Sequence, residues 1–146
     1  MIRLLDVNVL VALFDPGHVH HETAHAWFAG QRPHGWATCP ATENGLVRIL
    51  SNPRYPGRRT TTGDAADRLR AFVGSGDHVF WPGDVSLLDP ARVRLEALRG
   101  HGDVSDVHLL AVALRHGGGL ATFDRKLGPE AVVGAESAHI LRIQAA

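Results

Sequence analysis

The sequence predicts one α/β domain in which helices cover both faces of a parallel β-sheet. Short apolar runs that suit buried strands alternate with longer segments of helical periodicity, which is the pattern expected of a parallel sheet. The 146 residues are enough for one domain, and they contain no internal repeat or low-complexity tract. We therefore interpret residues 1–146 as a single domain.

In the first half of the chain, strands are predicted at residues 2–5 and 35–38. The helix after the first strand ends at Asp15-Pro16-Gly17, because proline and glycine interrupt helices. Pro40 suits the first turn of the helix that follows the second strand. The helices predicted in this half span residues 9–14, 20–31, 40–51 and 61–76.

The second half continues the alternation of strands and helices. A helix is expected within residues 89–102, with Asp89 as its N-cap and Pro90 at its first position. Another helix is expected to begin with Ser105 as its cap and to end at the glycines of residues 117–119. The strands predicted in this half span residues 78–81, 120–122 and 138–143.

The composition is that of a globular protein without a net charge. Hydrophobic residues make up 45% of the chain, and 15 basic residues balance 15 acidic ones, so any affinity for nucleic acid must come from a local patch or a bound metal. Cys39 is the only cysteine, which excludes an internal disulfide and fits a reducing cytosol. The N-terminal apolar run is short and contains Asp6 and Asn8, which argues against a membrane span or a signal peptide. We expect a cytoplasmic protein.

Four acidic residues are predicted to meet at one edge of the sheet. Asp6 directly follows the first strand, and Asp124 lies two residues beyond the strand at 120–122. Glu43 and Asp106 fall in the first turns of two later helices. Ligands of open α/β sheets lie beyond the carboxyl ends of the strands, so we expect all four carboxylates to approach the same rim.

Each acid also has a purely structural interpretation, as a helix cap or as a partner of a helix dipole. That interpretation is weaker for Asp6, because Asn8 already suits the N-cap. Clustered carboxylates repel one another by about 4 kcal/mol per pair at a separation of ~4 Å and an effective dielectric of ~20. A cation would neutralise them, and oxygen ligands suit Mg²⁺ or Mn²⁺, which serve in phosphodiester hydrolysis. We therefore expect Asp6 to face a metal ion.

Four segments of the chain resemble PIN-domain ribonucleases, and more narrowly the VapC toxins of type II toxin–antitoxin pairs. The match runs over about residues 2–127 and includes LLDVNVLVALFDPGHVHHETAHAWF, TENGLVRILSNPR, HVFWPGD and VSDVHLLAVALRHGGGLATFDRKL. The resemblance implies a three-layer α/β/α fold and a Mg²⁺- or Mn²⁺-dependent endoribonuclease that hydrolyses RNA with a metal-activated water. It also implies a homodimer and a cognate antitoxin that inhibits it.

The family's acidic positions fall on the same four acids, which are Asp6, Glu43, Asp106 and Asp124. The resemblance implies that Asp6 and Asp106 are the primary metal ligands and that Glu43 orients or deprotonates the attacking water. The family's neighbouring polar positions fall on Asn8 and Ser105, which we expect to support the acids.

Two residues depart from the family pattern. Asp103 replaces a neutral polar residue. It is either a fifth acid at the rim or, as we favour, a charge near the start of a helix. We place it among the supporting residues. Lys126 replaces a small residue and is expected to alter phosphate contacts beside Asp124. Trp36, Phe80 and Trp81 are interpreted as core residues rather than platforms for stacked bases. Basic residues around a Pro/Gly-rich loop suggest an RNA-binding patch, unless they form a solvated face: Arg48, Arg54, Arg58 and Arg59.

Two other functions compete with the ribonuclease. His21-Glu22-Thr23-Ala24-His25 matches the H-E-x-x-H pattern of zinc metalloproteases. We disfavour a protease because the two histidines flank the apolar stripe of their helix and Glu22 points away from it. A PIN-like binding module without catalytic activity is the second alternative, and the loss of an acid would favour it. All four acids are present.

Overall fold

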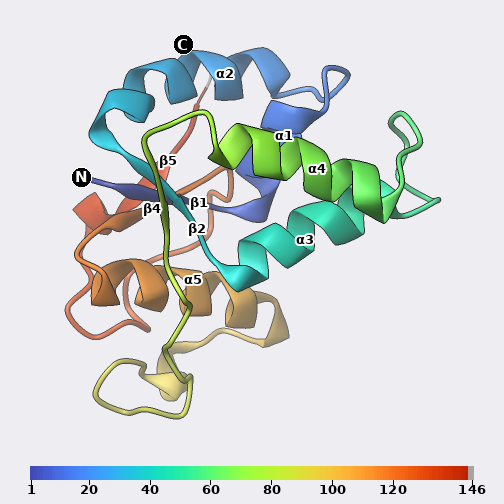
Figure 1. The fold of residues 1–146 in the computed structure, drawn as a ribbon. Helices are drawn as coiled ribbons and strands as arrows, with labels where there is room; N and C mark the ends of the chain where they lie inside the picture. The colour runs from blue at the N-terminus through green and yellow to red at the C-terminus, as the bar shows by residue number, and fades with distance from the viewer. Residues whose placement is uncertain (145–146) are drawn as a thin grey trace.

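The computed structural model describes residues 1–144, and a single five-stranded sheet in the order β3-β2-β1-β4-β5 forms its centre (Figure 1). All four pairs of neighbouring strands are parallel, which confirms the predicted parallel sheet. The N-terminal strand is the middle strand, so the chain builds the sheet outward in both directions. The strands are β1 (Arg3–Leu5), β2 (Trp36–Thr38), β3 (His78–Phe80), β4 (Gly119–Thr122) and β5 (Ile140–Arg142).

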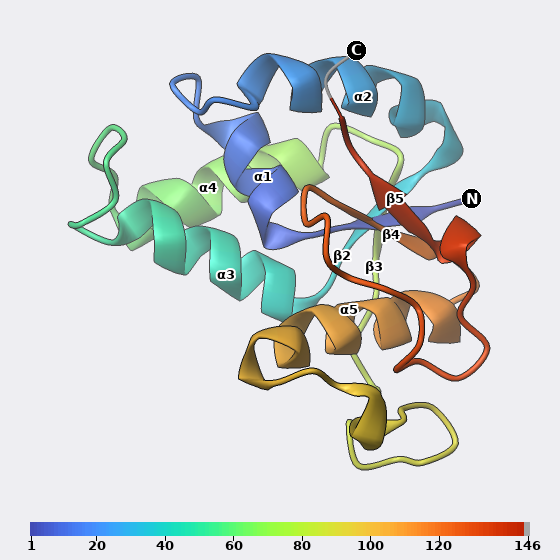
Figure 2. The same ribbon diagram turned by 180° about the vertical axis from the view of Figure 1, so that it is seen from behind.

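Helices cover both faces of the sheet and give the three-layer α/β/α fold. Figure 2 shows α5 against one face, with α1, α2 and α4 on the opposite side of the sheet. None of the helices in the described residues combines the length and the apolar character needed to cross a bilayer. The helices are α1 (Val7–Phe14), α2 (His21–Gln31), α3 (Pro40–Ser51), α4 (Thr62–Val73) and α5 (Val104–Arg115).

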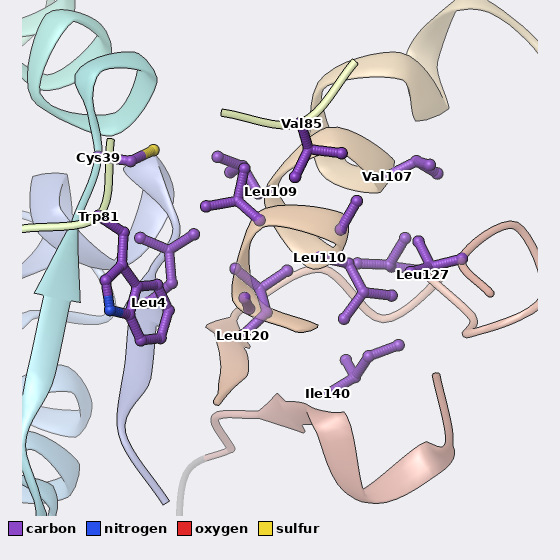
Figure 3. Close-up of a cluster of buried hydrophobic side chains, with 14 of the residues drawn as sticks. Leu4, Cys39, Trp81, Val85, Val107, Leu109, Leu110, Leu120, Leu127 and Ile140 are labelled. Atoms are coloured by element: carbon purple, nitrogen blue, oxygen red, sulfur yellow. The ribbon is translucent and has the colours of Figure 1, made fainter. Parts of the chain in front are cut away.

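The apolar side chains of the strands alternate between two cores. In β1, Leu4 belongs to the core beneath α5, whereas Leu5 belongs to the core formed with the other four helices. Figure 3 shows the α5 core, in which Leu4 lies across from Leu110 and Leu120; all three side chains are fully buried. This alternation fixes the register of β1, because a shift by one residue would exchange its two faces.

The large aromatic residues do not all lie in the core. Trp36 and Trp81 are buried, one in each core, which confirms the prediction for both. Phe80 is half exposed, so the prediction that it is a core residue is wrong. It belongs to β3, an edge strand that pairs with β2 alone and leaves one side uncovered.

The helix predicted within residues 89–102 does not form. Val93 makes an antiparallel bridge with Val132, and backbone hydrogen bonds of 2.8 and 2.9 Å join this segment to residues 131–133. Two short 3-10 turns, Leu95–Ala97 and His101–Asp103, are the helical parts of this segment. The backbone groups that a helix would have used are bonded to another part of the chain instead.

The helices α1 and α5 begin earlier than predicted. In each of them the residue that was expected to be the N-cap lies inside the helix. α1 begins at Val7, because Asp6 is its N-cap and accepts a hydrogen bond from the Val7 N–H at 2.7 Å. Asn8 therefore lies inside the helix and is not its cap. α5 begins at Val104, which makes Ser105 its second residue rather than its cap.

The close packing of α3 against α1 depends on Gly45. A Cβ atom at this position would lie 2.7 Å from Cγ2 of Val7, which is too close for any side chain. The contact places α3 directly beside the residue that follows Asp6. It therefore holds one wall of the site close to the first predicted acid.

Candidate active site

Asp6 lies where β1 passes into α1, and it faces the end of β4. Its backbone N–H donates to the Ala121 carbonyl at 3.0 Å. Its carboxylate accepts hydrogen bonds from the Val7 N–H and from the Thr122 hydroxyl, both at 2.7 Å, and the residue is only 6% exposed. Burial raises the pKa of Asp6, as does the charge of Asp124, whereas the two hydrogen bonds act in the opposite direction.

Thr122, the fully buried last residue of β4, joins the polar groups of the site. Its hydroxyl donates to Asp6 Oδ2 and accepts from the Asp124 N–H at 3.0 Å and from Asn8 Nδ2 at 3.3 Å. Asn8 also accepts a hydrogen bond from the Phe123 N–H at 3.3 Å. Sequence reasoning missed Thr122, although a polar residue that ends an apolar strand two positions before an acid was a usable signal.

Replacing Thr122 by valine is expected to destabilise the protein by about 1–3 kcal/mol, because the buried Asp6 and Asn8 side chains would lose a hydrogen-bond partner. Thr122→Ser keeps the hydroxyl and is the control. Urea unfolding measures the loss of stability, and equal stability of both variants would contradict the role of the hydroxyl.

Asp106, in the first turn of α5, interacts with both Asp6 and Asp124. Burial, the charge of Asp6 and a hydrogen bond with Asp124 raise the pKa of Asp106 to about 7. With a pKa of about 7, the Asp106 carboxyl exchanges its proton close to neutral pH. The structure thus brings three of the four predicted acids together.

A cavity of about 550 Å³ opens beside these acids, between α1, α3 and α5. Asp6 and Asp106 line it, and so do the predicted supporting residues Asn8 and Ser105. Arg48 of α3 lines the same cavity. Among the described residues that line this cavity, none of the other three arginines of the predicted RNA-binding set is present.

The other three arginines of that set lie elsewhere. Arg58 and Arg59 line a second cavity of about 550 Å³, which they share with Tyr55 and residues of α4. Arg54 is exposed in the loop between α3 and α4. The four arginines therefore do not form a single patch at the acids.

Glu43 lies at the carboxyl edge of the sheet, beside Thr38 at the end of β2, but no interaction in the described residues joins it to the other three acids. Ala41 and Gly45 of α3 line the acidic cavity. Glu43 is two positions from each of them, so its side chain leaves α3 in a direction about 200° away from theirs. Its carboxylate accepts a hydrogen bond from the Thr38 hydroxyl at 2.7 Å and lines a different cavity, between α3 and α4. The same hydroxyl lies 2.7 Å from Nε2 of His78.

Asp103, directly before α5, is paired with Arg99. Its carboxylate accepts from Arg99 Nε at 3.0 Å, from Arg99 Nη2 at 2.9 Å and from the Arg99 backbone N–H at 2.9 Å. These hydrogen bonds lower the pKa of Asp103. The charge of Asp103 still contributes to the raised pKa of Asp106, so the pair lies close to the site.

The two histidines of the H-E-x-x-H pattern bind backbone rather than metal. His21 Nδ1 lies 2.7 Å from the Ala12 carbonyl oxygen, and His25 Nε2 lies 2.9 Å from that of Leu13. These carbonyls belong to the last turn of α1, where they have no partner within the helix. The pattern therefore has a structural explanation, since both rings are occupied in capping α1.

A comparison with known protein families assigns this chain to one of them. The model of the PIN domain family matches residues 3–128, which include all four predicted acids. The chain belongs to the PIN-domain family. The PIN-domain match covers every strand except β5 and all five helices.

Two curated relatives and one solved structure place the chain among VapC-type PIN-domain proteins. Ribonuclease VapC44 of Mycobacterium tuberculosis is 44% identical over 140 residues, which cover 96% of this chain and 98% of the relative. Ribonuclease VapC39 of the same organism is 46% identical and covers 92% and 96% of the two chains. The crystal structure of M. tuberculosis VapC20, described as a sarcin-ricin loop cleaving toxin, has the same fold, with a TM-score of 0.61 at 20% identity over 93% of this chain and 99% of that one.

Proposed function

We propose that this PIN-domain protein is a Mg²⁺- or Mn²⁺-dependent endoribonuclease and the toxin of a type II toxin–antitoxin pair. The observation that supports the proposal most directly is the acid cluster of Asp6, Asp106 and Asp124. Burial raises the pKa values of Asp6 and Asp106, and the charges of neighbouring acids raise them further. The relatives named ribonucleases support RNA as the substrate.

The residues present fit a hard divalent cation. In residues 1–144, no three His, Cys, Asp or Glu side chains are arranged so that they could hold an ion by themselves. Mg²⁺ is commonly bound by one or two carboxylates, with waters and substrate phosphates as its other ligands. Asp6 and Asp106 would supply these two carboxylates, and the ion would relieve their repulsion. Bound there, it would stabilise charge on the phosphate and lower the pKa of a water.

The chain's own groups would then position the substrate and manage protons. Asp6 keeps its orientation through the hydrogen bonds from Val7 and Thr122. Asp106 would release its proton when the cation binds. Arg48 would contact an RNA phosphate in the acidic cavity. We give Glu43 no part in binding the ion, because it faces the cavity between α3 and α4.

We further propose that the protein acts in the cytoplasm as a homodimer and that a cognate antitoxin inhibits it. This part of the proposal rests on the resemblance to VapC toxins. Growth arrest on expression, relieved by co-expression of a partner encoded beside the gene, would support it. Sedimentation of the purified protein would establish whether it is a dimer.

The metal requirement is tested directly with purified protein and a mixed-sequence RNA. Cleavage is expected with Mg²⁺ or Mn²⁺, none with EDTA, and recovery after the metal is restored. Calorimetric titration with Mn²⁺ in the absence of RNA gives a second readout, and binding should release protons because Asp106 loses its proton when it binds the ion. Cleavage undiminished by EDTA, or no cleavage with either ion, would contradict the proposal.

A further inference from the structure

A smaller cavity, of about 310 Å³, lies between the start of α5, the segment before it and the segment after β4. It is lined by Arg99 and Asp103, by residues of the segment after β4, and by Val107 of α5. Val107 is the residue after Asp106, and Lys126 is two residues after Asp124. The Lys126 N–H donates to Asp124 Oδ1 at 2.8 Å. The cavity therefore adjoins the acid cluster.

The lining of this cavity combines apolar walls with two kinds of polar group. Four of its lining residues are apolar and partly or fully buried: Ala97, Val107, Leu127 and Ala131. Arg99 and Lys126 add cationic donors, whereas Asp103 and Glu130 add carboxylates. Apolar walls suit a base better than a phosphate. The two carboxylates would also repel a phosphate, so the lining favours a nucleobase.

Arg99 is held in a fixed orientation by Asp103. Two of its five guanidinium N–H groups, one on Nε and one on Nη2, donate to the two oxygens of Asp103, which leaves three available. A guanidinium fixed along one edge presents its remaining donors as a rigid fork. The most common partner of such a fork among the bases is guanine, through O6 and N7.

Glu130 supplies the acceptors that guanine requires on its other edge. An ionised carboxylate only accepts hydrogen bonds, and guanine offers donors at N1 and at its 2-amino group. The Glu130 carboxylate lies directly against Gly128, where any side chain would collide with it. Adenine would instead present its 6-amino donor to the donors of Arg99, and it has no donor at N1. Of the two purines, guanine therefore matches this lining better.

We infer that the cavity bounded by Arg99, Lys126 and Glu130 binds a guanine base next to the phosphate that is cleaved. Arg99 reads O6 and N7, Glu130 accepts from N1 and the 2-amino group, and Lys126 contacts the adjoining backbone. Asp103 is a positioning residue, because it acts by orienting Arg99. This inference rests on the proposed ribonuclease activity and adds a sequence preference to it.

The test uses short single-stranded RNAs that share one mapped cleavage site and differ only at the nucleotide on its 5′ or 3′ side. At one of these positions, guanosine is expected to exceed adenosine in kcat/KM by roughly 5- to 150-fold, which is the discrimination of one bidentate contact. Inosine lacks the 2-amino group and is expected to fall between them. Glu130→Gln should reduce the difference between guanosine and inosine.

Arg99→Lys keeps the charge but removes the fork, and it is expected to bring the ratio of guanosine to adenosine within about two-fold, well below the discrimination of a bidentate contact. Arg115→Lys is the matched control, because Arg115 is also paired with a carboxylate, Asp84, at 2.9 Å but lies at the far end of α5. Its ratio should equal that of the wild type. Equal kcat/KM for guanosine and adenosine at both positions, or a preference that survives Arg99→Lys, would overturn the inference and leave the ribonuclease activity standing.

Binding without turnover separates this inference from the proposed function. In EDTA, guanosine 5′-monophosphate is expected to shift the methyl NMR signals of Leu127 in the wild type, and adenosine 5′-monophosphate to shift them much less. Arg99→Lys should lose the difference. If no RNA is cleaved with Mn²⁺, the proposed function fails, and the NMR comparison alone then decides whether the guanine site exists. Equal shifts with both nucleotides would refute it.

Discussion

Replacing Asp6 by asparagine is expected to lower RNA cleavage about 1,000-fold or more, equivalent to about 4 kcal/mol of lost transition-state stabilisation. The variant removes a charge that would hold the cation, but it keeps an oxygen that can cap α1. Asparagine is as good an N-cap as aspartate, so the variant should remain folded. Cleavage is measured with the metal ion in excess, and circular dichroism verifies the fold.

Two further variants sharpen this experiment. Asp106→Asn should cause a loss of similar size, because Asp106 would supply the second carboxylate. Asp84→Asn is the control, since Asp84 is an exposed acid at the other end of α5 that pairs with Arg115 and His116. Full activity in Asp6→Asn or Asp106→Asn would remove the metal-nuclease proposal. A loss of equal size in Asp84→Asn would show that the assay reports general destabilisation.

The metal-free protein is expected to lose stability as the pH rises from about 4 to about 7, and Asp106 is the cause. An aspartate in an unfolded chain loses its proton near pH 3.9. In the folded protein the pKa of Asp106 is raised to about 7. Between these values the folded state holds more protons than the unfolded state, so the free energy of unfolding falls with increasing pH and levels off above about pH 7.

Asp106→Asn should abolish most of this pH dependence and melt at a higher temperature than the wild type in EDTA at pH 7.5. Metal should reverse the order. At ten times its dissociation constant, Mg²⁺ would stabilise the wild type by about 1.4 kcal/mol, or roughly 3–6 °C, and the variant much less. Melting curves of both proteins at several pH values provide the measurement. If the variant is less stable in EDTA and gains equally from metal, the acids are structural caps.

The part of the site that depends on strand ends could be predicted from the sequence. Apolar runs locate the strands, and parallel pairing brings their carboxyl ends to one rim, where Asp6 and Asp124 meet. Asp106 joins them from the first turn of α5. These positions follow from local patterns and one topological rule.

The orientation of helical side chains could not be predicted in the same way. Glu43 lies on the correct helix, but the rotation of α3 about its own axis is set by packing, including the contact of Gly45 with Val7. Side chains two residues apart on a helix point in directions about 200° apart, so the rotation of α3 decides which of them reach the acidic cavity. The pairing of Arg99 with Asp103 was equally hidden, because the sequence there suggested a helix that does not form.

The central position of β1 has a consequence for how the protein is made. Asp6 is synthesised 116 residues before its hydrogen-bond partner Thr122. The middle strand has a neighbour on its second side only after β4 has been synthesised. Long-range pairs of this kind form late in folding. A chain whose synthesis has not yet passed β4 lacks Asp124, so its acid cluster is incomplete.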